Sequence, residues 1–202
     1  MERKGPDFAL IESIVSEAFV PICYGGGVSS IEDFSRLFRL GVEKVSVNTA
    51  ALTNTALVSE AAARFGSQSV VASIDVKRTM FGGYEVYGSS GKQRTRHDPV
   101  ELARTLQKAG AGELVVCAIH KDGTMTGFDL QLTKMMVEAV DIPVVTLGGA
   151  GNVTHLKEAL ANGASGAAAG SMFVFHGPHR AVLISYPSES ELGRHLNPEA
   201  TR

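Results

Sequence analysis

Residues 21–27 read PICYGGG and residues 143–149 read PVVTLGG, and these two stretches open the two copies of an internal repeat. Residues 21–49 align with residues 143–171 without a gap. Each copy has an apolar run of strand length, a glycine cluster, a helix-like stretch, a further glycine and a second apolar run that closes on small polar residues. This order is typical of successive strand–helix units in a parallel sheet.

The same alternation extends over the whole chain. We expect strands at residues 20–24, 44–48, 70–76, 114–119, 143–147 and 167–171, and helices at residues 7–18, 30–40, 54–65, 99–109, 129–139 and 153–161. The strand runs are apolar at successive positions, which predicts a sheet covered on both faces. A closed barrel of such units has eight strands. The sequence therefore predicts an α/β fold, a single incomplete (β/α)8 TIM barrel over residues 1–202, whose first two strands would precede Met1.

The composition argues against several classes of protein. Lys and Arg number 19 and Asp and Glu number 21 in 202 residues, and no basic block indicates a nucleic-acid partner. We find no apolar run that suits a signal peptide or a membrane span, so we expect a cytoplasmic protein without a membrane partner. Cys23 and Cys117 lie in apolar runs without metal-site spacing, so we expect reduced thiols in the core.

The segment 80–98 is rich in Gly, Ser and charged residues and interrupts the alternation. It is too long for an ordinary connection between a strand and a helix. We interpret it as an active-site flap or a small hairpin, and the alternative is a solvated insertion.

The glycine clusters predict two phosphate sites. Glycines at the end of a strand let an oxyanion approach backbone N–H groups, and the following helix N-terminus adds partial positive charge. A barrel's phosphate site uses the loops after two adjacent strands, and each copy of the repeat supplies such a pair. The first site would comprise Gly26, Gly27, Asn48 and Thr49, and the second Gly148, Gly149, Gly170 and Ser171. A ligand with a phosphate at each end would span the two, unless the glycines only form tight turns.

Two carboxylates follow strand runs and are candidates for acid–base chemistry. Asp75 would face the barrel mouth, where partial desolvation suits a general acid or base, and the alternative is an ion pair with Lys77 or Arg78. Asp122 would be a second acid at the mouth, and the alternative is an Asx-turn or a helix cap. Lys44 and Glu113 come at the opposite ends of their strands, where charges usually serve stability.

Six motifs in unbroken order resemble the cyclase subunit of imidazole glycerol phosphate synthase. They are PICYGGGVSSIEDF (21–34), KVSVNTAAL (44–52), FGSQSVVASIDVKR (65–78), GAGELVV (110–116), KDGTMTGFD (121–129) and TLGGAGN (146–152). The resemblance runs from about residue 7 to residue 175. The isomerase that acts one step earlier in the histidine pathway matches less well around residues 122–129.

This resemblance implies a ribulose-phosphate-binding barrel that works as a lyase/cyclase in histidine biosynthesis, with no metal and no cofactor. A glutaminase (glutamine amidotransferase) subunit at the N-terminal face would release ammonia through the barrel. The ammonia would convert a bisphosphorylated ribulosyl-formimino aminoimidazole carboxamide ribotide to imidazole glycerol phosphate. The resemblance implies catalysis by Asp75, mouth contacts from Asp122 and Gly123, and an ammonia gate that includes Lys44 and Glu113.

The sequence also departs from that family. The family's second catalytic aspartate lies on the first strand, ahead of Met1, and Cys117, His120 and Leu147 stand where Thr, Asp and Ser are usual. The ending FVFHGPHRAVLISYP (173–187) looks more like a paralogue from surface-polysaccharide (lipopolysaccharide) gene clusters, which is associated with ammonia supply for an acetamidino sugar.

A third alternative is a catalytically silent module that keeps phosphate or partner affinity.

An incomplete barrel of six strands would leave two unprotected sheet edges. We therefore expect the chain alone to aggregate, to bind hydrophobic dye or to pair with another copy, without turning over the substrate.

Overall fold

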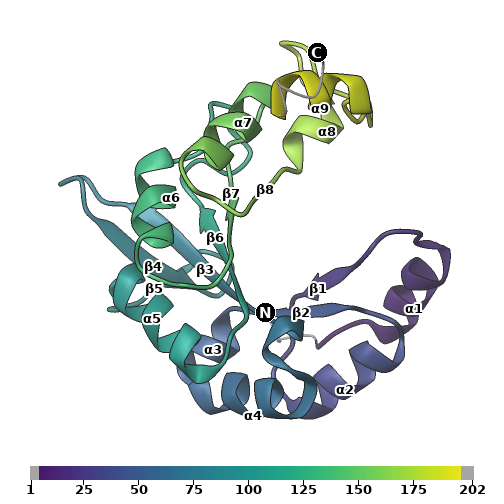
Figure 1. The fold of residues 1–202 in the computed structure, drawn as a ribbon, viewed down its shortest axis with the longest axis vertical. Helices are drawn as coiled ribbons and strands as arrows, with labels where there is room; N and C mark the ends of the chain where they lie inside the picture. The colour runs from purple at the N-terminus through teal and green to yellow at the C-terminus, as the bar shows by residue number, and fades with distance from the viewer. Residues whose placement is uncertain (1–4, 197–202) are drawn as a thin grey trace.

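A curved parallel sheet forms the centre of the computed structural model, which describes residues 5–196 (Figure 1). Its strands follow the hydrogen-bonded order β1-β2-β3-β6-β7-β8, and neighbours along this path run parallel. They are β1 (Cys23–Gly25), β2 (Lys44–Val47), β3 (Val70–Arg78), β6 (Glu113–Ala118), β7 (Val144–Leu147) and β8 (Gly166–Ala168). Every expected strand is present, and the order is that of consecutive strands in a (β/α)8 barrel.

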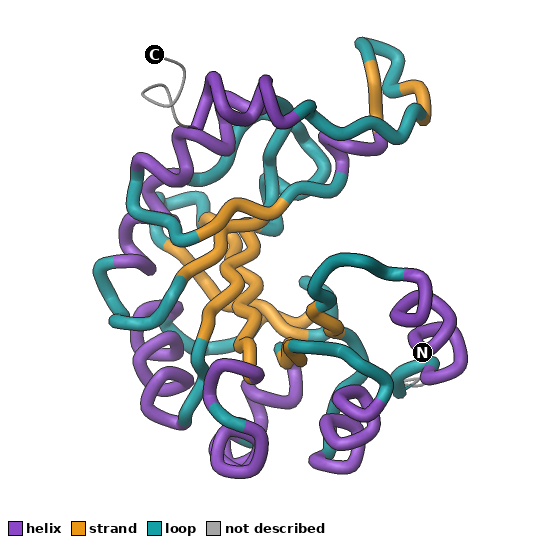
Figure 2. The backbone as a smooth tube through the Cα atoms, turned by 45° about the vertical axis from the view of Figure 1, so that its right-hand side comes forward, coloured by secondary structure: helices purple, strands orange, loops and turns teal. Residues whose placement is uncertain are grey.

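Most helices lie along the outer, convex side of this sheet, as Figure 2 shows in purple around the orange strands, whereas α1, α8 and α9 lie at the two ends of the curve. The helices are α1 (Phe8–Glu17), α2 (Ile31–Arg39), α3 (Thr49–Thr53), α4 (Thr55–Phe65), η1 (Ser67–Ser69), α5 (Pro99–Ala109), α6 (Leu130–Val137), α7 (Val153–Ala161), α8 (Ser171–Val174) and α9 (Glu189–Leu196). The hydrophobic core lies between these helices and the outward-facing residues of the strands, such as Val45, Ile74 and Val116.

The two faces of the sheet differ in burial, which corrects the expectation that both are covered. In β3, Ile74 and Val76 are fully buried, whereas Ser73 and Asp75 are only half-buried. Side chains alternate between faces along a strand. The inner, concave face is therefore partly open at Ser73 and Asp75. The strand runs are apolar at successive positions because half-buried Val115, Val145 and Leu147 on this face alternate with the buried outward-facing residues.

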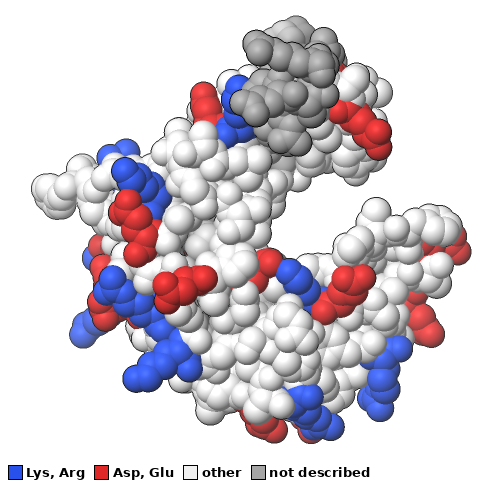
Figure 3. Space-filling view, viewed as in Figure 1, with Lys and Arg blue, Asp and Glu red and all other residues white. Residues whose placement is uncertain are grey.

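The sheet curves into a C that is open between β8 and β1 (Figure 1). Within residues 5–196, each of these strands bonds to a single neighbour, β7 and β2 respectively. The space-filling view shows the surface hollowed between the two ends (Figure 3). Cys23 is consequently exposed on β1, so the expectation of a core thiol is wrong there, whereas Cys117 on β6 is buried.

A β-hairpin occupies the segment 80–98, as one of the two interpretations expected. Strand β3 continues past the mouth and pairs with β4 (Tyr84–Gly88), which pairs in turn with β5 (Gln93–Arg94). A second, shorter hairpin joins β9 (Phe175–His176) and β10 (Ala181–Val182) beyond α8.

Local sequence signals set the helix ends. Ser30 caps α2 in a capping box with Asp33, and the Asn54 side chain caps α4. Gly110 ends α5 in the left-handed conformation that glycine adopts readily. Gly66, which follows α4, has φ +87° and ψ 141°, a conformation outside both the extended and the left-handed helical regions, and the chain continues directly into η1.

Candidate active site

Asp75 lies on the inner face near the C-terminal end of β3, at the mouth of the curved sheet. Burial raises the pKa of its carboxyl above 3.8; a hydrogen bond with the Asn48 side chain lowers the pKa, and the nearby Asp122 carboxylate raises it. Among the described residues Asp75 forms no ion pair, so the alternative of pairing with Lys77 or Arg78 is not supported. Cys117 faces Asp75 in the β3–β6 register, and burial followed by Asp75 raises the pKa of its thiol to about 12.

Asn48 links β2 to α3 beside Asp75, and Thr49 is the first residue of α3. The Asn48 Oδ1 is buried and has no hydrogen-bond partner within residues 5–196, which leaves an acceptor that a ligand donor would satisfy. The Thr49 Oγ1 accepts from the Ser89 backbone N–H at 3.1 Å. Because that bond uses an oxygen lone pair, the Thr49 hydroxyl hydrogen remains available to an anion.

The two glycine clusters follow β1 and β7, at opposite arms of the C (Figure 1). Gly26 and Gly27 have φ +125° and +73°, and a Cβ added at Gly26 would meet only the Tyr24 hydroxyl, at 3.9 Å. At Gly149, with φ +108°, a Cβ would stand 2.3 Å from the Gly127 carbonyl oxygen. The second cluster is thus held against the loop after β6, while the first is open to approach.

That loop also carries Asp122 and Gly123, and it lies beside the end of β8. A Cβ added at Gly123 would be 4.0 Å from the Ser171 Oγ, and Gly170 has open space around it. The Arg180 guanidinium from the second hairpin donates to the Gly123 carbonyl at 2.8 Å. The structure thus brings the predicted residues Asp122, Gly123 and Ser171 into one region.

Lys44 and Glu113 lie at the other end of the inner face, as first residues of β2 and β6. Their side chains form an ion pair with an Nζ–Oε2 distance of 2.5 Å that crosses in front of β3. Cys23 lies next to this pair, and its thiol pKa is raised by burial and by Glu113 and lowered by Lys44. The charged pair therefore lies at the N-terminal ends of the strands, at the opposite end of the inner face from Asp75.

Sequence reasoning missed a network around Asp129, the N-cap of α6. Its carboxylate accepts from the Tyr84 hydroxyl at 2.8 Å and from the Leu132 N–H at 3.0 Å, and lies 3.2 Å from the His120 Nε2. Burial, then the hydrogen bond to Asp129, raises the pKa of Tyr84 to about 12. The alternating residues 84–88 indicate a strand, and an acid before α6 indicates a helix cap. Neither pattern indicates that Tyr84 and Asp129 contact each other.

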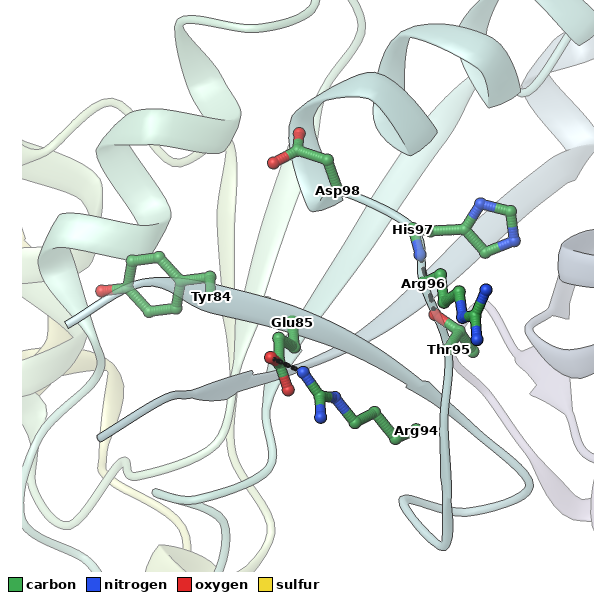
Figure 4. Close-up of a pocket in the computed structure, with 7 residues that line it drawn as sticks. All are labelled: Tyr84, Glu85, Arg94, Thr95, Arg96, His97 and Asp98. Atoms are coloured by element: carbon green, nitrogen blue, oxygen red, sulfur yellow. Dashed lines mark hydrogen bonds and ion pairs between the residues drawn. The ribbon is translucent and has the colours of Figure 1, made fainter. Parts of the chain in front are cut away.

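A cavity of about 520 Å³ lies outside the mouth, between β4, β5 and the start of α5 (Figure 4). Figure 4 shows an ion pair between Arg94 and Glu85 on its wall, with Arg96 and His97 pointing to the opposite side from Tyr84. The predicted site residues do not line it.

In the described part of the chain, His, Cys, Asp and Glu side chains nowhere form a group of three or more that suits a metal ion. No helix between residues 5 and 196 is long and apolar enough to cross a bilayer.

Comparison with known proteins identifies the family. Residues 1–179 match the model of the family described as histidine biosynthesis protein. A relative from Pseudomonas aeruginosa, provisionally named imidazole glycerol phosphate synthase subunit hisF2, is 45% identical over 93% of this chain and 75% of its own length. Relatives from Vibrio vulnificus (hisF3) and Leptospira interrogans (HisF), with equally provisional names, are 42% and 40% identical over 92% and 94% of this chain and 72% and 76% of their own lengths. The chain therefore belongs to the histidine biosynthesis protein family, with a TIM-barrel type of fold.

Proposed function

We propose that this chain is an ammonia-dependent cyclase subunit that forms imidazole glycerol phosphate in histidine biosynthesis. The observation that carries the proposal is Asp75, a half-buried carboxyl with a raised pKa at the mouth of the sheet. A carboxyl that keeps its proton to a higher pH than usual is better suited to general acid–base chemistry. The relatives named as imidazole glycerol phosphate synthase subunits support the reaction class.

The proposed substrate is the ribotide with a phosphate at each end. Gly26, Gly27, Asn48 and Thr49 would bind one phosphate, and Gly148, Gly149, Gly170 and Ser171 the other. Their positions at the two arms of the C support a ligand that spans the mouth (Figure 1). The unpaired Asn48 Oδ1 would accept a hydrogen bond from the substrate beside Asp75.

The proposed nitrogen source is a glutaminase subunit docked at the N-terminal ends of the strands. The pair formed by Lys44 and Glu113 would control the passage of ammonia from that face to the mouth. Its support is the location of the pair on the inner face of the sheet, one strand apart on either side of β3.

The test is Asp75→Asn, assayed with ammonium salts and the bisphosphorylated ribotide. We expect the rate to fall by about 10²–10⁴, the usual contribution of a general acid or base, with the fold retained. Asp141→Asn, which changes an exposed carboxylate beyond the opposite end of β7, is the matched control and should keep full activity. Activity of Asp75→Asn within about tenfold of the parent would refute the role.

A second candidate is the paralogue that supplies ammonia for an acetamidino sugar. The family match stops at residue 179, so β10 and the segment after it lie outside the matched part. If this candidate holds, the bisphosphorylated ribotide is not turned over, while ammonia transfer from the glutaminase still depends on Lys44 and Glu113. Phosphate binding with neither activity would point to the silent module.

A further inference from the structure

The imidazole of His120 is held from both sides. Its Nδ1 accepts from the Arg78 backbone N–H at 3.4 Å, and its Nε2 lies 3.2 Å from the Asp129 Oδ2. A backbone N–H only donates and an ionised carboxylate only accepts, so these partners assign the hydrogen to Nε2. Both nitrogens of the neutral ring are then occupied, and His120 is not free to exchange protons with a substrate.

The hydrogen bond from the Arg78 backbone N–H to the His120 side chain continues the row of hydrogen bonds between β3 and β6 beyond its last backbone pair. The last backbone contact is from the Ile119 N–H to the Val76 carbonyl, at 2.9 Å. His120 fixes the next position, where β6 has ended and β3 pairs only with β4. Asp75 comes three residues before Arg78, and Asp122 comes two residues after His120. The spacing of these two acids therefore depends on the junction that His120 makes.

Asp129 anchors this junction from behind. The residue is 7% exposed, and its carboxylate receives hydrogen bonds from Tyr84 on β4, from His120 and from the α6 backbone. Three donors satisfy a buried carboxylate, and removing one leaves a costly unpaired group. The Asp129 side chain thus connects three segments, which are the β4–β5 hairpin, the loop after β6 and the start of α6.

We propose that His120, Asp129 and Tyr84 are positioning residues that hold Asp122 at a fixed distance from Asp75 at the mouth. The kinetic part of this inference rests on the proposed cyclisation, whereas the structural part does not. The groups that face Asp75 are Asp122 from the loop after β6, Cys117 from β6 and Asn48 from the end of β2. Loosening the junction would move Asp122 away and admit water, and both changes lower the pKa of Asp75.

The experiment compares His120→Asn, His120→Gln and Tyr84→Phe in the full chain. Asn can replace only the acceptor for Arg78 and Gln only the donor to Asp129, so each breaks one half of the junction. The pKa of Asp75 is measured by NMR titration of its carboxyl carbon without substrate, and we expect it to fall toward 3.8 in all three variants. Tyr186→Phe removes an exposed hydroxyl elsewhere and should leave the titration unchanged.

The kinetic measurement separates this inference from the proposed function. We expect kcat to fall by about tenfold to a hundredfold with a smaller change in KM, because misplacing a group by about 1 Å has effects of this size. A shifted Asp75 titration in a chain without cyclase activity would support the positioning role and refute the cyclase. Folded variants that keep the parent's Asp75 titration and kcat would overturn the positioning role.

Discussion

Asp75 holds its proton more tightly in the folded chain than in the unfolded one, mainly because it is buried. Below pH 3.8 the carboxyl is protonated in both states and makes no difference to stability. As the pH rises through 3.8, the unfolded chain loses the proton first, so the stability of the folded state falls until the pH exceeds the raised pKa and stays lowered above it. The residue that supports the proposed chemistry therefore destabilises the fold at neutral pH.

Asp75→Asn should consequently raise the melting temperature at neutral pH, since Asn needs no proton to be neutral. The gain should shrink as the pH is lowered toward 3.8, and a series of thermal melts across this range measures it. Asp141→Asn should show no such trend. A loss of stability at neutral pH, or a gain that does not depend on pH, would contradict the raised pKa.

At the scale of elements, the best predicted helices are those with complete end signals. Helix α5 has the expected bounds, because Asp98 caps it, Pro99 starts it and Gly110 ends it. Helix α3 was not expected, because its five residues directly after β2 carry no side-chain cap and too few turns for a periodic pattern. Strand β1 begins later than expected, after Pro21, which lacks the N–H that a ladder needs.

In the candidate site, too, some residues could be predicted from the sequence and others could not. The sequence predicts the residues at strand ends, such as Asp75 and Asp122, because the end of a parallel strand fixes which edge a side chain reaches. It does not predict the contact between Tyr84 and Asp129, which are 45 residues apart and depend on how the hairpin folds back. Exposure of Cys23 was also missed, because an apolar run does not show whether its strand ends a sheet.

The capping box of α2 supports a prediction at this scale. Ser30→Ala removes the acceptor for the Asp33 N–H and should lower the free energy of unfolding by about 0.5–2 kcal/mol. Urea unfolding followed by circular dichroism measures the change. Ser29→Ala is the matched control: Ser29 contributes its backbone N–H to Asp33, which the substitution preserves, so stability should stay close to the parent's.

For the whole molecule, the curved sheet presents a free edge at β1 and another at β8 within residues 5–196. Next to β1, Phe19 is 100% exposed and Val20 is 69% exposed. Unpaired backbone groups beside apolar side chains favour pairing with another chain. The expectation that the chain associates with itself, and the expectation that two strands precede Met1, both stay predictions.

Replacing Phe19 and Val20 together by Lys should reduce this association, since charge at an edge opposes pairing. Light scattering after size-exclusion chromatography, over a range of concentrations, measures the mass of the species. Leu160→Lys, at a partly exposed position on α7, should leave the mass distribution as it is. A parent chain that is monomeric at every concentration would show that these edges do not drive association.

The two cysteines lie at opposite ends of the concave face and differ in reactivity. Alkylation requires both the thiolate and access to the sulfur. The pKa of both thiols is raised, but that of Cys117 reaches about 12 and its sulfur is buried, whereas Cys23 is exposed. A maleimide dye should therefore attach to Cys23 first, with one label per folded chain and two after denaturation, as counted by mass spectrometry. The dye would lie next to Lys44 and Glu113. Its emission would report on a protein that docks there, while the mouth around Asp75 remains chemically untouched.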